Sequence, residues 1–150
     1  MATGLENLKI YKLAEDLEVK VHEVTKLFPK DEIYRSVDQL RRSSASVSNN
    51  LAEHYHKSTT KEKIRFISIA KGEIEETKRG ILKAARKKIL PENTAKDIAE
   101  QYTVLMKGTN AYVRFLMLNE GKKDSGKPKP ETILNQNQKP LTKNKDVSQN

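Results

Sequence analysis

Six cationic side chains gather in one short stretch of the chain, and no acidic residue separates the first from the last. They are Lys78, Arg79, Lys83, Arg86, Lys87 and Lys88. Such a cluster attracts polyanions, and the phosphate backbone of a nucleic acid is a common one. The alternative is a solvated helix surface, because the helix dipole stabilises cations near a C-terminus by about 0.3–1 kcal/mol each. We predict that this stretch binds RNA or DNA.

Further cations extend the predicted nucleic-acid site along the chain. They are Arg41, Arg42, Arg65 and Lys71. Asp38 precedes the two neighbouring arginines by one helical turn, so one arginine can form an ion pair with it while the other points outward. Glu62 and Glu75 offer Arg65 and Lys71 similar exposed pairs, worth only about 0.3–0.5 kcal/mol. Since the chain lacks a recognised base-reading motif and interleaved aromatic residues, we predict binding through charge without base-specific readout.

The other polar residues form no recognisable catalytic or metal-binding pattern. The chain has no cysteine, no glycine-rich phosphate loop after a strand, and no serine in a nucleophile elbow. His54 and His56 are two residues apart and therefore face different sides of a helix, while His22 lies in another segment. Glu73, Glu75 and Glu76 are a possible metal cluster, but residues two apart diverge, and such runs are usually solvated helix surface. We expect a protein without enzymatic activity, cofactor or bound metal.

Composition favours a single small helical domain. The chain has 150 residues, a formal net charge of +9, 35% hydrophobic residues, 5% aromatic residues and no tryptophan. Such a balance suits amphipathic helices better than a β-sandwich or barrel. No apolar run approaches the roughly 18 residues that cross a bilayer, and the N-terminal residues lack the features of a secretory signal. We therefore expect a cytoplasmic protein with no membrane contact.

Four stripes of apolar or small residues recur at helical spacings of three and four. They comprise Ile10, Ala14, Leu17, Val21, Val24 and Phe28; Val37, Leu40, Ser44, Val47 and Leu51; Ile67, Ala70, Ile74, Thr77, Ile81 and Ala84; and Ile98, Tyr102, Leu105, Thr109, Tyr112 and Leu116. No strand pattern competes with them. Four amphipathic helices with short connections predict an all-α fold, an antiparallel up-down-up-down four-helix bundle.

Local signals place the helix ends and the close contacts. Pro29 ends the first helix after Phe28, and Leu27 is expected to widen its apolar face. Thr59 and Glu62 have the spacing of a capping box at the start of the third helix, which should run to about Ile89. Gly72 and Gly80 each cost about 1 kcal/mol relative to alanine in that helix, which predicts tight packing at both positions.

The composition changes abruptly near residue 119. Residues 1–119 are expected to form the bundle, whereas residues 120–150 are rich in Lys, Asn, Gln and Pro and carry few large apolar side chains. Burying so few side chains cannot offset the ordering of the backbone, so we expect residues 120–150 to form a disordered basic tail. The alternative is a segment around Ile133 and Leu134 that docks on a partner.

Several motifs, in order, resemble one known family. The chain contains Leu8-Lys9-Ile10-Tyr11, the loop Phe28-Pro29-Lys30-Asp31-Glu32-Ile33-Tyr34, the segment 39–47 (QLRRSSASV) followed by Asn50-Leu51-Ala52-Glu53, and 61–72 (KEKIRFISIAKG). Together they resemble the small bacterial four-helix-bundle proteins encoded in intervening sequences of 23S ribosomal RNA genes. Ser48 and His54 stand where that family usually has proline and glycine, so the second helix is expected to be straighter and longer.

The resemblance carries its own expectations about assembly and partners. It implies a homopentamer, no catalytic activity, and a distant kinship to the accessory protein that assists the reverse transcriptase of diversity-generating retroelements. Combined with the cation cluster, it predicts an oligomeric, nucleic-acid-binding structural or accessory factor. Two alternatives stay open: a protein–protein adaptor whose cations give solubility or meet an acidic partner, and an accessory subunit of a reverse transcriptase.

Overall fold

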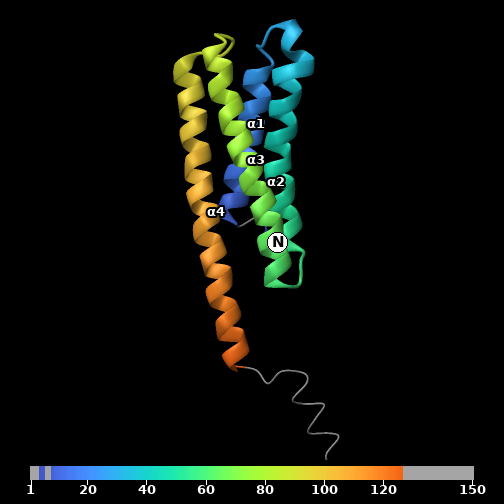
Figure 1. Cartoon of the computed structure of the whole chain (residues 1–150), viewed down its shortest axis with the longest axis vertical. Helices are drawn as coiled ribbons and strands as arrows, with labels where there is room; N and C mark the ends of the chain where they lie inside the picture. Colours follow the sequence, from blue (N-terminus) through green and yellow to red (C-terminus); the bar gives the residue numbers. More distant parts are fainter. Residues whose placement is uncertain (1–3, 6–7, 127–150) are drawn as a thin grey trace, which may run out of the picture. The chain divides into compact units, whose positions relative to one another are not determined.

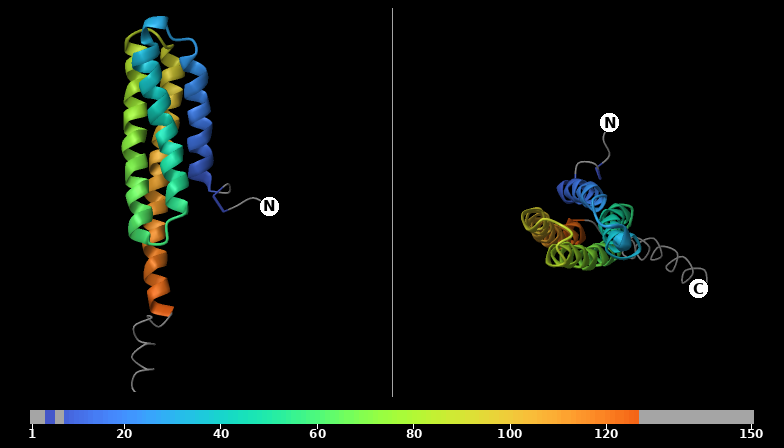
Figure 2. Two further views of the ribbon diagram at one scale, coloured as in Figure 1. Left: turned by 90° about the vertical axis from the view of Figure 1, so that its right-hand side faces the viewer. Right: turned by 90° about the horizontal axis from the view of Figure 1, so that it is seen from above.

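Four long helices and two short helical turns make up the computed structural model, which describes residues 4–5 and 8–126 and their side chains through residue 120. The elements are α1 (Lys9–Thr25), the 3₁₀ turn η1 (Lys30–Glu32), the π-helical turn η2 (Ile33–Val37), α2 (Asp38–Tyr55), α3 (Thr60–Arg86) and α4 (Glu92–Gly126). The described residues contain no strand. The helices run alternately up and down and pack side by side (Figures 1 and 2), which confirms the predicted all-α four-helix bundle.

The last helix passes from one structural unit into another. The first unit ends at Arg114 and contains the bundle, and the second begins at Phe115. Because α4 is helical through Gly126, the boundary expected after residue 119 falls inside this helix. The disorder and the docking segment predicted farther along, in 127–150, lie outside the described residues.

The core is formed mainly by the four predicted stripes, although Val24, Tyr112 and Leu116 of these stripes are only half-buried. The side chains with no exposed surface include Leu17, Val21, Val47, Leu51, Ile67, Ile74, Ile81, Ile98, Tyr102 and Leu105. The stripe of α3 is buried at all six of its predicted positions. Each aliphatic side chain of this size contributes about 1.5–3 kcal/mol on burial, so the stripes supply the main driving force for packing.

The end of α1 differs from the prediction. The helix ends at Thr25, and the backbone amides of Lys26, Leu27 and Phe28 bond to carbonyls three residues earlier. This tighter winding changes the direction of the side chains, so that Phe28 is buried while Leu27 is 85% exposed. The prediction that Leu27 widens the apolar face is wrong.

The capping residue of α3 is the predicted one. The Thr59 side chain accepts a hydrogen bond of 3.2 Å from the Glu62 amide. At the other end, the helix stops at Arg86, three residues before the expected Ile89. Lys88 adopts a left-handed conformation with φ 62°, and the amide of Ile89 bonds back to the carbonyl of Ala84. This Schellman arrangement satisfies carbonyls that the helix end leaves unpaired.

The two glycines of α3 have different surroundings. A Cβ atom at Gly80 would lie 2.8 Å from Leu40 Cδ2, so this glycine permits the close approach of α2 that was predicted. A Cβ atom at Gly72 would meet nothing within 4 Å. The prediction of tight packing at Gly72 is wrong, because this position faces solvent.

Small hydroxyl side chains connect α2 to its neighbours. Thr77 and Ser43 form a buried hydrogen bond of 2.7 Å between α3 and α2. The Ser48 hydroxyl bonds to the Glu18 carboxylate of α1. The α-helix continues across Ser48 and through His54, the two positions at which the chain departs from the pattern of the family that it resembles.

Candidate nucleic-acid interface

The basic end of α3 lies beside the turn that joins α1 to α2. Figures 1 and 2 show the segment 26–37 and the end of α3 at the same end of the bundle. Lys87 Nζ lies 3.7 Å from Glu32 Oε1 and 3.5 Å from Ser36 Oγ. Glu32 Oε2 also accepts hydrogen bonds of 2.5 Å from the Ser36 hydroxyl and 3.4 Å from the Ser36 amide. Glu32 therefore fixes the turn to the end of α3.

Its surroundings keep Glu32 in the anionic form. The hydrogen bond from the Ser36 hydroxyl lowers the pKa of this carboxyl group, and the Ser36 amide and the charges of Lys87 and Arg35 act in the same direction against the effect of burial. One of the six clustered cations, Lys87, is thus compensated by a carboxylate. No periodic pattern could predict this pair, because Glu32 and Lys87 are far apart in the chain.

Three of the predicted cations form an exposed row on α3, the α3 cationic stripe: Arg79, Lys83 and Arg86. They are spaced by four and three residues and so share one face, and each is exposed. Within the described part of the chain, no carboxylate lies within ion-pair distance of these three side chains. Lys88 is exposed just beyond the helix end, and Lys78 is half-buried beside the stripe. Uncompensated positive charge is therefore concentrated here.

Arg42 has the predicted acidic partner, but the prediction that the other arginine points outward is wrong for Arg41. Arg42 forms an exposed ion pair of 3.3 Å with Asp38 on its own helix. Arg41 turns toward α1, where its Nε donates a hydrogen bond of 3.0 Å to Thr25 Oγ1. The structure therefore engages both arginines in contacts within the protein.

Arg65 and Lys71 also lie apart from the stripe. Arg65 is 14 residues before Arg79, or about 21 Å along the helix, and its guanidinium lies 5.9 Å from the centre of the Phe66 ring. Lys71 is half-buried. Among the described residues neither side chain has a carboxylate partner, so the ion pairs considered with Glu62 and Glu75 are not formed.

Sequence reasoning missed Arg35. This residue of η2 is exposed and lines a cavity of about 120 Å³ together with Ser36, Gln39, Lys83 and Lys87; Glu76 also lines it. The cavity joins η2, the start of α2 and the end of α3, so positive charge from two distant segments meets in one place. The only local feature of the sequence that could have marked Arg35 as an interface residue is its place after Tyr34 in the loop that follows Pro29.

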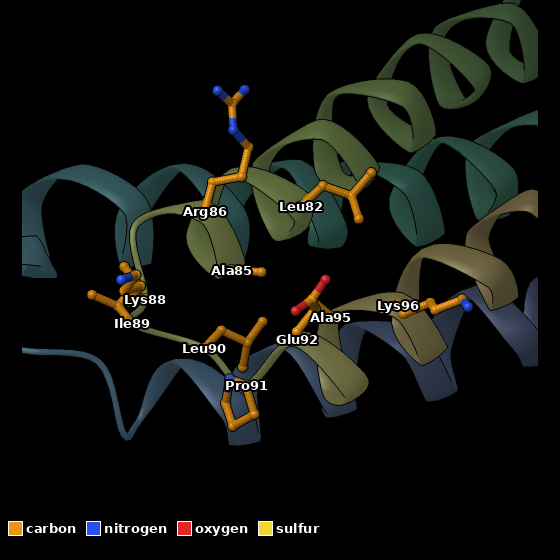
Figure 3. A pocket seen from close by; sticks show the side chains of 10 residues that line it. All are labelled: Leu82, Ala85, Arg86, Lys88, Ile89, Leu90, Pro91, Glu92, Ala95 and Lys96. Atoms are coloured by element: carbon orange, nitrogen blue, oxygen red, sulfur yellow. The ribbon is translucent and has the colours of Figure 1, made fainter.

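An open apolar hollow of about 820 Å³ lies between the end of α3 and the start of α4. Leu82, Ala85, Leu90 and Pro91 supply apolar lining, and Leu82 is 41% exposed. The other lining residues include the cations Arg86, Lys88 and Lys96, and Glu92. Figure 3 shows the Arg86 guanidinium directed away from the hollow. The hollow is thus an apolar surface with mostly positive surroundings.

His54 serves the core of the bundle. Its Nδ1 is within hydrogen-bond distance of the Leu51 carbonyl, and its Nε2 lies 3.1 Å from the Tyr112 hydroxyl. A neutral ring satisfies both contacts, with Nδ1–H donating to the carbonyl and Nε2 accepting from the hydroxyl. Burial lowers the pKa of His54, and the nearby charge of Lys63 adds to this effect, while the contact with the carbonyl opposes it.

The remaining acidic and histidine side chains do not gather into a metal site in the part of the chain that the structure describes. Glu73 lies near Glu76 in a polar cavity that Arg42 also lines. Burial and the neighbouring Glu76 raise the pKa of Glu73. No helix among the described residues is long and apolar enough to span a membrane.

The motifs and the helical bundle agree with a family comparison. Residues 6–111 match the model of the 23S rRNA-intervening sequence protein family. The chain belongs to this family. A solved structure from Bacteroides thetaiotaomicron, described as a protein of unknown function from the S23 ribosomal protein family, is similar with a TM-score of 0.65 and 18% identity, covering 69% of this chain and 97% of that one. At this identity the likeness concerns the fold alone. No curated protein matches the chain.

Proposed function

We propose that this member of the 23S rRNA-intervening sequence protein family binds RNA or DNA through the basic end of its bundle and acts as a non-catalytic structural or accessory factor. The observation that carries the proposal is the α3 cationic stripe, Arg79, Lys83 and Arg86, whose charges are exposed and without carboxylate partners among the described residues. Lys88 and Arg35 add charge at the same end. A phosphate backbone releases counterions when it meets such a surface, which favours binding.

A salt titration tests the proposal. Fluorescence anisotropy would follow the binding of labelled ribosomal RNA and random-sequence DNA between about 50 and 500 mM salt, over which phosphate-driven affinity falls steeply. The site variant replaces Arg79, Lys83 and Arg86 by glutamine. Its matched control replaces Lys12, Lys61 and Lys107, exposed lysines away from the stripe, by glutamine.

The two variants lose the same formal charge, so only the position of the charge distinguishes them. If each stripe cation meets one phosphate, the slope of log affinity against log salt falls in magnitude by about 2 to 3 for the site variant and much less for the control. Equal losses in both variants would mean that net charge, not the stripe, governs binding. Absence of salt-sensitive binding by the unmodified chain would refute the proposal.

The adaptor remains the second candidate, and the apolar hollow favours it. The hollow offers Leu82, which is 41% exposed, to an apolar side chain, and Lys88 and Lys96 to acidic residues beside it. An acidic peptide segment fits that chemistry. This candidate predicts that the chain captures an acidic protein while binding neither RNA nor DNA in the titration above.

The homopentamer and the reverse-transcriptase partner stay predictions of the family resemblance. We propose self-association because several large apolar side chains are exposed on the bundle, among them Val19 at 61% and Val104 at 60%. Light scattering coupled to size-exclusion chromatography would measure the oligomeric state. A ring of copies would repeat the cationic stripe around its axis and strengthen its field.

A further inference from the structure

The turn beside the cationic stripe exposes an aromatic ring. Tyr34 of η2 is 92% exposed, which is the largest exposure among the large hydrophobic side chains of the described residues. Most surface apolar residues need no special explanation. Tyr34 differs from them because it lies between cations, with Lys30 earlier in the same turn and Arg35 next to it, although Asp31 also lies in this turn.

The backbone of the turn is held in place, and the Tyr34 ring extends from it into solvent. Glu32 bonds to Ser36 on one side and meets Lys87 on the other, and these contacts surround Tyr34 in sequence. Val37 is buried directly after the turn. The backbone that presents Tyr34 is thus tied to the bundle at both ends. A pre-positioned group loses little freedom when it binds a ligand.

The neighbouring cavity suits a phosphate group. Arg35, Lys83 and Lys87 line it with Ser36 and Gln39, and one carboxylate, that of Glu76, also lines it; its volume is about 120 Å³. Lys87 is already near Glu32, whereas Arg35 and Lys83 have no carboxylate within ion-pair distance among the described residues. Tyr34 does not itself line this cavity, but it directly precedes Arg35, which does. Proteins that hold single-stranded nucleic acid combine exposed aromatic rings, on which bases stack, with a positively charged groove that follows the backbone.

We propose that the basic end of the bundle is selective for single-stranded nucleic acid, with an unpaired base stacked on Tyr34 and an adjacent phosphate held by Arg35 and Lys83. This inference rests on the proposed function and narrows it from any polyanion to strands or loops whose bases are accessible. Bases in a duplex are already stacked on one another and cannot use the ring. Stacking on an aromatic face tolerates any base, so the binding remains without sequence readout.

The test compares Tyr34→Ala with Tyr34→Phe on three probes. These are fluorescein-labelled oligoadenylate RNA, the corresponding DNA single strand, and the matched duplex, measured by anisotropy at constant salt. Tyr34→Ala is expected to weaken binding of either single strand by about 5- to 100-fold and to leave duplex binding within about twofold. Tyr34→Phe keeps the ring and is expected to retain single-strand affinity. Because the side chain is exposed, both variants should melt like the unmodified chain in circular dichroism.

The outcomes separate this inference from the function on which it rests. If the unmodified chain binds in a salt-dependent way and Tyr34→Ala leaves single-strand affinity unchanged, the stacking inference is overturned while the nucleic-acid proposal stands. Equal loss on single strands and duplex overturns it as well. If Tyr34→Ala changes the oligomeric state in light scattering, the ring serves contacts between copies and the inference is overturned. If the unmodified chain binds no probe, both proposals fail.

Discussion

The two glycines of α3 allow a matched test of how closely α2 and α3 pack. Gly72→Ala and Gly80→Ala make the same chemical change in the same helix. Alanine favours a helix interior over glycine by about 1 kcal/mol, and this gain is common to both variants. The packing cost is not common to them: a new methyl group at position 72 meets nothing within 4 Å, whereas at position 80 it lies 2.8 Å from Leu40 Cδ2.

The distances set the expected magnitudes. Carbon atoms prefer a separation of about 3.5–4.0 Å, so the methyl group at position 80 overlaps Leu40 by roughly 0.7–1.2 Å. Leu40 is 2% exposed, and it can move only against the packed core. Overpacking of this kind costs about 1–3 kcal/mol. We expect Gly72→Ala to stabilise the bundle by about 1 kcal/mol, and Gly80→Ala to range from neutral to about 2 kcal/mol less stable than the unmodified chain.

Thermal and urea unfolding followed by circular dichroism would measure both changes. For a domain of this size, 1 kcal/mol corresponds to a shift in Tm of about 4 °C. Subtracting one variant from the other removes the shared helix propensity and leaves the packing cost at Gly80. The reasoning would be refuted if Gly80→Ala stabilised the protein as much as Gly72→Ala, or if Gly72→Ala lowered the Tm.

Three further predictions address the pH dependence, the end of α3 and the core. The folded state holds His54 neutral with a lowered pKa, so the unfolded chain binds a proton that the folded chain excludes. The free energy of unfolding should therefore decline as the pH falls below about 6.5, and His54→Gln should flatten that decline in thermal melts. A decline that the substitution leaves unchanged would contradict this assignment. Lys88→Gly replaces a lysine in the left-handed backbone region and should add about 0.5–1 kcal/mol to the free energy of unfolding. It should also reduce the slope of log RNA affinity against log salt by about 1, because one cation is lost. A lower Tm would contradict the cap geometry. Ile74→Asp places a charge in the core and should unfold the bundle, and an unchanged Tm would show that Ile74 is not buried.

The apolar stripes were predictable because they are local patterns. In α3, spacing alone identified six positions, all of which are buried. The first helix was less accurate at its end, since the backbone tightens after Thr25 and the regular period no longer applies to Leu27. Gly80 and Gly72 look alike in the sequence, and only the path of α2 distinguishes them.

The candidate interface was predictable in part. The charge of Arg79, Lys83 and Arg86 follows from their spacing on one helix. The neutralisation of Lys87 by Glu32 does not, because it depends on how the turn after α1 folds back. The same fold brings Arg35 to Lys83, and no periodic pattern connects residues so far apart in the chain. Long-range pairs of this kind arise from topology.

The ion pair between Lys20 and Asp97, at 2.7 Å, joins the first helix to the last across most of the folded chain. The hairpin of α2 and α3 can form as soon as α3, which follows the short connection 56–59, has been synthesised. Part of α1, in contrast, packs against α4: a Cβ atom at Gly108 of α4 would lie 3.0 Å from Ile10 Cγ2 of α1. During translation this contact cannot form, so Ile10 lacks part of its cover until α4 has left the ribosome.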